Sequence, residues 1–159
     1  MQKMIIFLLF SLVVILFLNG CNANNENQDI FQYKDSFVGD NSAVGNIVKQ
    51  LQSGEHLVGF ELKTKEKPYG MILNYDWSES ENIYKETAIY NATFIFALVQ
   101  NADWVTFNFD NQEYTITKEN LQGWYGKELS GFKNEDELQK LTEEFLNKAI
   151  SAAFPFKIY

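Results

Sequence analysis

Several residue types that support chemistry are scarce or missing in this chain. Its 159 residues include no arginine, one histidine and one cysteine. Without a guanidinium group, no side chain can hold a phosphate or carboxylate by two parallel hydrogen bonds. With His56 as the lone histidine, a histidine-dependent triad has one possible centre, and a His-rich transition-metal site is excluded. We therefore expect no catalytic residue, no metal and no cofactor, and we interpret His56 as a solvated loop residue.

The only cysteine, Cys21, closes an apolar N-terminal segment. Lys3 precedes an uncharged run over residues 5–18, which is shorter than the about 20 apolar residues that a membrane-spanning helix needs. The run ends in Leu-Asn-Gly-Cys and resembles the lipobox of bacterial lipoproteins, although Asn19 departs from the usual small or β-branched residue. Residues 1–20 are therefore predicted to be a signal peptide. The alternative is an uncleaved hydrophobic anchor with a structural cysteine.

Lipidation of Cys21 would place the protein on the extracytoplasmic face of the cell membrane. A diacylglycerol on the thioether and an amide-linked chain such as palmitate together anchor stably. Residues 22–29 carry no large apolar side chain, so residues 21–29 are predicted to be the lipidated cysteine and a flexible tether. Residues 30–159 are predicted to form a single globular domain without a free thiol.

The acidic balance limits the partners of this domain. The whole chain has a net charge of −8, and removal of residues 1–20, which contain one lysine and no acid, gives −8 − 1 = −9. Nucleic acid is an unfavourable partner for such a domain. The expected partners are the membrane, reached through the lipid, and an unknown envelope protein or peptide.

The apolar pattern alternates between helical and strand periods. Apolar residues at i, i+3, i+4 and i+7 predict helices, and period-two alternation of apolar and polar residues predicts strands. A Ser78/Glu81 capping box and Asn134 are expected to begin two of the helices. The predicted elements are a helix over 41–52, a hairpin over 57–77, a helix over 79–100, a hairpin with inward Val105, Phe107, Phe109, Tyr114 and Ile116, a helical turn near 118–123 and a helix over 134–151.

This order of elements predicts an α+β fold. Two hairpins supply an antiparallel sheet of about four strands, with the helices packed on one face in the order helix-hairpin-helix-hairpin-helix. The two helix-hairpin units share the same order of elements but no visible sequence identity, so we do not interpret them as a repeat.

The segment FVGDNSAVGNI, residues 37–47, has the composition of a ligand-binding loop. It does not fit a phosphate-binding loop, because its glycines enclose five residues and an asparagine stands where lysine is required. We favour a helix-capping turn, in which Gly45 allows close contact between helix and sheet. A weaker hypothesis gives a binding role to Asp40, Asn41 and Ser42.

Two further patterns have weaker chemical interpretations. Residues 76–82 alternate like calcium ligands, but the glycine and the final glutamate of a calcium loop are missing. The acids Asp76, Glu79, Glu81 and Glu86 could supply a glycosidase-type pair, although acids in the first turn of a helix are explained by its dipole. Both patterns are better explained as a helix entry.

The segment 33–47 is similar to the signature of an uncharacterised family of bacterial lipoprotein domains, domain of unknown function 4825. The Lys-Pro-Tyr-Gly stretch at 67–70 and the region from Phe96 to Phe107 resemble that family as well. The resemblance covers about residues 31–117. It implies a secreted or membrane-attached protein of a Gram-positive bacterium, and it implies no activity.

One further stretch has the character of a binding loop. Gly123-Trp124-Tyr125-Gly126 places two large aromatics between glycines, and Trp and Tyr are enriched among interface anchors. The alternative is that Trp124 covers the core as a lid. We expect a lipid-anchored module that binds a protein, a peptide or another envelope component and catalyses nothing. The alternative is a small envelope hydrolase that uses carboxylates or the Ser42 hydroxyl.

Overall fold

The computed structural model describes residues 29–151, with side chains up to residue 147. The predicted signal peptide, Cys21 and nearly all of the tether lie outside the described residues. The elements are η1 Ile30–Tyr33, α2 Asn41–Gln50, η2 Gly54–His56, β1 Leu57–Lys63, β2 Gly70–Tyr75, α3 Glu81–Leu98, β3 Trp104–Phe109, β4 Gln112–Thr117, α4 Lys118–Tyr125, η3 Leu129–Gly131 and α5 Glu135–Ser151.

The fold is α+β, as predicted, with a four-stranded sheet built from two hairpins. The strand order is β1-β2-β3-β4. Both hairpins are antiparallel, but β2 and β3 are parallel, with Gly70 opposite Trp104 and Tyr75 opposite Phe109. The sheet is therefore mixed and not antiparallel throughout. The reason is that α3 crosses the sheet between the hairpins and returns the chain to the end from which β2 started, which is the connection that parallel neighbours require.

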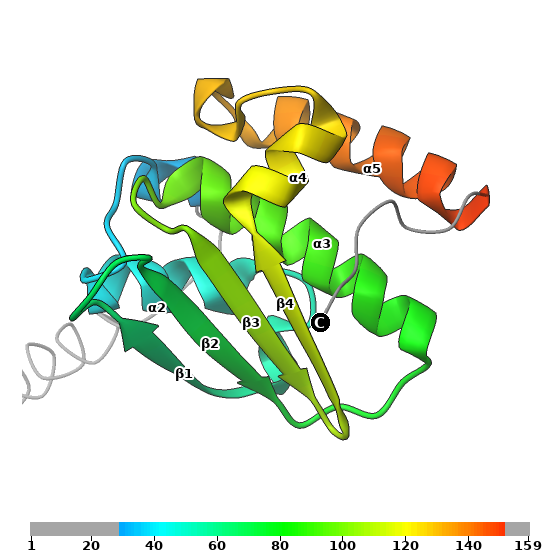
Figure 1. Ribbon diagram of the computed structural model, residues 1–159, viewed down its shortest axis with the longest axis horizontal. Helices are drawn as coiled ribbons and strands as arrows, with labels where there is room; N and C mark the ends of the chain where they lie inside the picture. Colours follow the sequence, from blue (N-terminus) through cyan, green and yellow to red (C-terminus); the bar gives the residue numbers. More distant parts are fainter. Residues whose placement is uncertain (1–28, 152–159) are drawn as a thin grey trace, which may run out of the picture.

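The helices lie on one face of this sheet, as predicted. Figure 1 shows α2 and α3 behind the strands and no described helix in front of them. The strand residues that face the helices are almost fully buried, as the alternation of the second hairpin predicted; they are Met71, Leu73, Tyr75, Val105, Phe107, Phe109, Tyr114 and Ile116. The uncovered face carries polar pairs between neighbouring strands, such as Asn74 with Asn108, 2.8 Å apart.

One of the two predicted helix caps differs in the structure. The helix predicted from residue 79 begins at Glu81, and its N-cap is Ser80, whose side chain makes no capping hydrogen bond. The predicted capping box at Ser78 is therefore wrong. The backbone N–H of Glu79 instead donates to the hydroxyl of Tyr84 at 2.6 Å, which holds the helix entry against the core. The prediction for α5 is confirmed, because Asn134 Oδ1 accepts from the N–H of Glu137 at 2.9 Å.

Alternation in the sequence predicts that Val58, Phe60 and Leu62 share one face of the first strand, and the structure departs from that prediction at Val58. A β-bulge between Leu57 and Gly59 inserts Val58, which remains 68% exposed. Leu57, Phe60 and Leu62 pack against the core instead. A bulge adds one residue to one strand of the pair and so shifts the period-two pattern by one position.

Candidate functional site

The stretch around Asp40 begins a helix. The Asp40 carboxylate accepts a hydrogen bond from the N–H of Ala43 at 3.0 Å and caps α2. Asn41 and Ser42 are exposed residues of the first turn. A Cβ at Gly45 would lie 3.4 Å from the Phe60 ring, an ordinary van der Waals distance, so the expectation that glycine is needed here for close contact between helix and sheet stays a prediction. The capping interpretation is confirmed, and a binding role for these three residues stays a prediction.

The aromatic pair at the end of α4 packs between helices. Tyr125 is 4% exposed, and its hydroxyl lies 2.8 Å from the Thr93 hydroxyl of α3. Trp124 is half-buried, with its ring 5.3 Å from that of Phe145 in α5. Both residues belong to α4 and not to a loop, and Gly126 ends that helix with a φ of 62°. The lid interpretation accounts for these contacts, whereas Tyr125 as placed offers almost no surface to a partner.

The segments that carry the family resemblance meet at one end of the sheet. The strand-like residues around Ser36 pair with those around Val99, and the N–H of Val38 donates to Asn101 Oδ1 at 2.8 Å. In the loop between α3 and β3, which contains Asn101, the N–H of Asp103 donates to the carbonyl of Tyr69 at 2.8 Å. The Asp103 carboxylate in turn accepts from the N–H of Tyr69 at 2.7 Å. Three segments distant in sequence are thus joined by hydrogen bonds.

Trp104, the first residue of β3, is held in place by residues of the β1–β2 turn. Its indole N–H donates to the carbonyl of Pro68 at 3.1 Å. The indole also lies against Gly70, where an added Cβ would come within 2.3 Å of two ring carbons. Only glycine leaves room for the ring at this position. The turn and the indole therefore hold each other in one arrangement.

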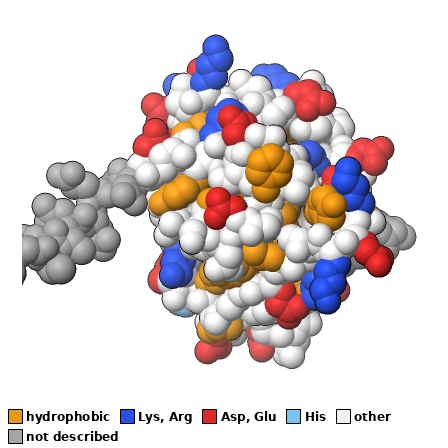
Figure 2. Space-filling model, turned by 90° about the vertical axis from the view of Figure 1, so that its left-hand side faces the viewer, with side chains coloured by type: hydrophobic (Ala, Val, Ile, Leu, Met, Phe, Trp, Pro, Cys, Tyr) orange, Lys and Arg blue, Asp and Glu red, His pale blue; other side chains and the backbone are white. Residues whose placement is uncertain are grey.

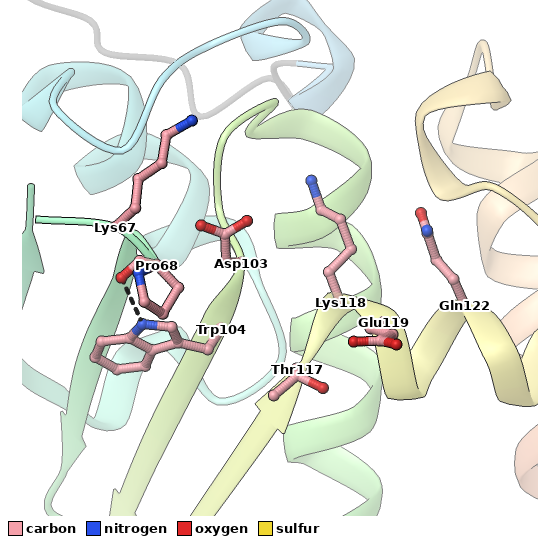
Figure 3. A pocket seen from close by; sticks show the side chains of 8 residues that line it. All are labelled: Lys67, Pro68, Asp103, Trp104, Thr117, Lys118, Glu119 and Gln122. Atoms are coloured by element: carbon pink, nitrogen blue, oxygen red, sulfur yellow. Dashed lines mark hydrogen bonds between the residues drawn. The ribbon is translucent and has the colours of Figure 1, made fainter.

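A hollow of about 710 Å³ opens beside this indole. It lies between the β1–β2 turn, the start of β3 and the junction of β4 with α4. In Figure 3 the side chains of Lys67, Asp103, Lys118 and Gln122 point to the same side, whereas Trp104 lies beside Pro68. The lining residues are Lys67, Pro68, Asp103, Trp104, Thr117, Lys118, Glu119 and Gln122.

The charges at the hollow are balanced. It is lined by two lysines and two acids. Lys118 is half-buried, and its ammonium donates to the carbonyl of Gln100 at 2.8 Å. Burial lowers the pKa of Lys118 below its ordinary value, and the nearby carboxylates of Asp103 and Glu128 act in the opposite direction. Figure 2, which views the side of the β1–β2 turn, likewise shows lysines and acids interspersed around apolar side chains.

The other predicted chemical groups lie away from this hollow. None of Asp76, Glu79, Glu81 and Glu86 lines it. His56 stacks on Trp77, with ring centroids 5.5 Å apart. Across residues 29–151, no three His, Cys, Asp or Glu side chains are grouped as a metal site would need. In the same part of the chain no helix has the length and apolar character to cross a bilayer.

The local sequence patterns do not predict the hollow. The family resemblance covers Lys67 and Pro68 in the Lys-Pro-Tyr-Gly stretch, and Asp103 and Trp104 in the region from Phe96 to Phe107, but it implies no site there. The available signal was a Lys-Pro-Tyr-Gly turn between two strands, a tryptophan at the start of a strand and a lysine just after another strand. The residues that local patterns missed are Asp103, Trp104, Thr117, Lys118, Glu119 and Gln122.

The comparisons with known proteins identify the family. Residues 30–119 match the family described as Domain of unknown function (DUF4825). This is more than half of the chain, which therefore belongs to that family. No curated protein and no solved structure matches the chain. The matched region ends at the second residue of α4, so it contains most of the lining of the hollow, from Lys67 to Glu119.

Proposed function

We propose that this protein is a lipid-anchored module of the Gram-positive cell surface, which binds an envelope protein, peptide or other envelope component and catalyses nothing. The observation that supports binding is the hollow, because its aromatic wall is preorganised. Trp104 is held by Pro68 and Gly70 before any ligand arrives. A concave site with an apolar wall and a few polar groups is the usual form of a ligand pocket.

The lipid on Cys21 would keep this hollow close to the envelope. The domain starts near Asp29, so seven residues separate it from the lipidated cysteine. A chain of that length spans at most about 25 Å when fully extended. The ligand is therefore expected among molecules that lie near the outer surface of the membrane. The alternative, a small hydrolase, would need a reactive pair at the hollow. Neither Ser42 nor the four predicted acids line it, and of the two acids that do, Asp103 already accepts a hydrogen bond from the N–H of Tyr69.

Site-specific photo-crosslinking in a Gram-positive host tests the proposal. A photoreactive amino acid replaces Glu119, which is exposed and lines the hollow, or Glu143, which is exposed on α5 and does not. We expect an adduct of defined mass from position 119 and none from position 143. Equal adducts from both positions, or none from position 119, would contradict binding at the hollow.

The non-catalytic part of the proposal has a separate test. Purified envelope fragments are incubated with the domain, and their masses are compared with those of fragments kept without it. Unchanged masses are expected. A domain-dependent mass change would favour the hydrolase.

A further inference from the structure

We propose that the hollow recognises a peptide through a free carboxylate, which binds the ammonium of Lys118. This inference rests on the proposed binding function and names the chemistry of its ligand. Three features support it: the position of the Lys118 ammonium, the balance of charge around it and the orientation of the Trp104 indole.

Among the described residues, the half-buried Lys118 ammonium has one hydrogen-bond acceptor. It donates to the carbonyl of Gln100 at 2.8 Å and lies 5.8 Å from the centroid of the Phe96 ring. An ammonium has three hydrogen-bond donors, so two remain for a ligand. Burial lowers the pKa of Lys118, although the carboxylates of Asp103 and Glu128 act in the opposite direction, so the ammonium is only partly solvated. A carboxylate that enters the hollow would restore that solvation with a charge-assisted hydrogen bond.

The neighbouring charges favour a singly charged carboxylate over a phosphate. Lys67 is the second cation of the hollow, but Asp103 and Glu119 oppose the two lysines. These acids would repel a dianion, and the chain has no arginine whose guanidinium could bind it by two hydrogen bonds. A peptide that carries an amine beside its carboxylate can place the amine near Glu119, an exposed acid in the first turn of α4.

The indole supplies the apolar wall of the site. Its N–H already donates to the carbonyl of Pro68, so a ligand can contact only the ring surface. Together with Pro68 this ring forms an apolar surface on which aliphatic side chains can rest. The combination of one ammonium and an apolar wall suits a short peptide with small side chains.

Peptides released from purified bacterial peptidoglycan are the probe. They are used as the soluble mixture and, in a second sample, after carbodiimide amidation of their carboxylates. Binding to the isotope-labelled mature chain is followed by the shifts of the Trp104 indole N–H and the Lys118 amide. We expect the unmodified mixture to shift both signals and amidation to weaken apparent affinity at least tenfold. The affinity should also fall as the pH rises through the lowered pKa of Lys118.

Two variants distinguish a specific role of Lys118 from a general effect of positive charge on peptide binding. Lys118→Met keeps the aliphatic stem and should lose binding as amidation does, whereas Lys133→Met, an exposed lysine outside the hollow, should bind as the parent does. The melting temperature checks that each variant folds. The amidation experiment uses the unaltered protein, so it stays decisive if Lys118→Met unfolds.

Each contrary result has a distinct meaning. Equal shifts with amidated peptides would overturn the carboxylate inference and leave the proposed binding function in place. Competition by inorganic phosphate at the same concentration would overturn it in favour of a phosphate ligand. No shift with either mixture, with crosslinking from position 119 intact, would show that the hollow takes another class of ligand. If neither mixture shifts the signals and position 119 gives no crosslink, the proposed binding function would be contradicted as well.

Discussion

Asn91 of α3 binds both backbone groups of Gln52, the second residue after the end of α2. Its Oδ1 accepts from the N–H of Gln52 at 3.1 Å, and its Nδ2 donates to the carbonyl of Gln52 at 2.9 Å. Asn91 is fully buried, and the same Nδ2 lies 3.3 Å from the Tyr75 hydroxyl. One amide thus ties α3 to β2 and to the chain between α2 and β1.

Replacement of Asn91 with alanine should destabilise the fold severely. The variant removes the partner of both backbone groups of Gln52, an exposed residue, and of the buried Tyr75 hydroxyl. An unsatisfied buried group costs about 1–3 kcal/mol. Chemical denaturation measures the loss. Asn82→Ala, an exposed residue of the same helix, is the matched control and should change stability by less than about 0.5 kcal/mol. Equal stability of the two variants would show that water replaces the amide.

Gly70→Ala should lower stability and disturb the hollow together. The added Cβ would meet the Trp104 ring at 2.3 Å and the Trp104 carbonyl oxygen at 2.5 Å. Such overpacking costs about 1–3 kcal/mol, and it would push the indole away from Pro68. The measurements are urea denaturation and the chemical shift of the indole N–H. Gly59→Ala is the control, because no atom lies within 4 Å of a Cβ there; an unchanged indole signal in Gly70→Ala would contradict this account.

The strand assignments could be predicted from sequence because burial there is periodic. In the second hairpin every second residue from Val105 to Phe109 faces the helices, and the sequence repeats that period. The parallel pairing of β2 with β3 was missed, because it depends on the path of α3 across the sheet and not on any local pattern. The bulge at Val58 was also not predicted, because Val58, Phe60 and Leu62 fit one unbroken alternation in the sequence.

The hollow was out of reach of local patterns for a physical reason. Its lining comes from three segments that are brought together by backbone hydrogen bonds, such as that from Asp103 to the carbonyl of Tyr69. Each segment alone looks like an ordinary turn or strand end. Lys118, for example, reads as the first residue of a helix, and only the fold places its ammonium beside the carbonyl of Gln100.

Asp40→Ala should destabilise α2 through the loss of its cap. Substitution of a capping aspartate by alanine costs about 0.5–2 kcal/mol, and here the Ala43 N–H would lose its acceptor. Thermal denaturation is the measurement. Asn41→Ala and Ser42→Ala are the controls, because both residues are exposed in the first turn. If all three variants melt like the parent but lose crosslinking from position 119, the segment would belong to the binding site and not to the scaffold.

Stability should fall in alkaline solution because two buried tyrosines resist ionisation. Burial raises the pKa of Tyr75 and of Tyr125 to about 12 from the ordinary value of 10.0. Between these values the unfolded chain releases a proton that the folded chain keeps. This contribution is therefore intact below pH 10 and is lost as the pH rises toward 12, by about 1.4 kcal/mol per pH unit for each tyrosine.

The Tyr125→Phe variant isolates one of these two contributions. It should show a smaller alkaline loss than the parent, by about 1.4 kcal/mol per pH unit above pH 10. Urea denaturation at pH 8, 10 and 11 provides the comparison, in which the deprotonation of lysines is common to both proteins. At pH 8 the variant also lacks the hydroxyl that lies 2.8 Å from Thr93, so only the slope with pH carries the test. Parallel pH profiles would mean that Tyr125 ionises without unfolding.

Cys21→Ala should release the protein from the membrane or leave an unprocessed precursor. The sulfur of Cys21 is the predicted site of the lipid, and the chain has no second cysteine to replace it. Each buried methylene of an acyl chain contributes about 0.8 kcal/mol to membrane binding, so loss of the lipid removes the anchor. Metabolic labelling with a fatty-acid analogue should mark the parent and the control Asn22→Ala but not Cys21→Ala. Equal labelling of all three proteins would place the lipid elsewhere, and the tether after Cys21 would then no longer keep the hollow near the membrane.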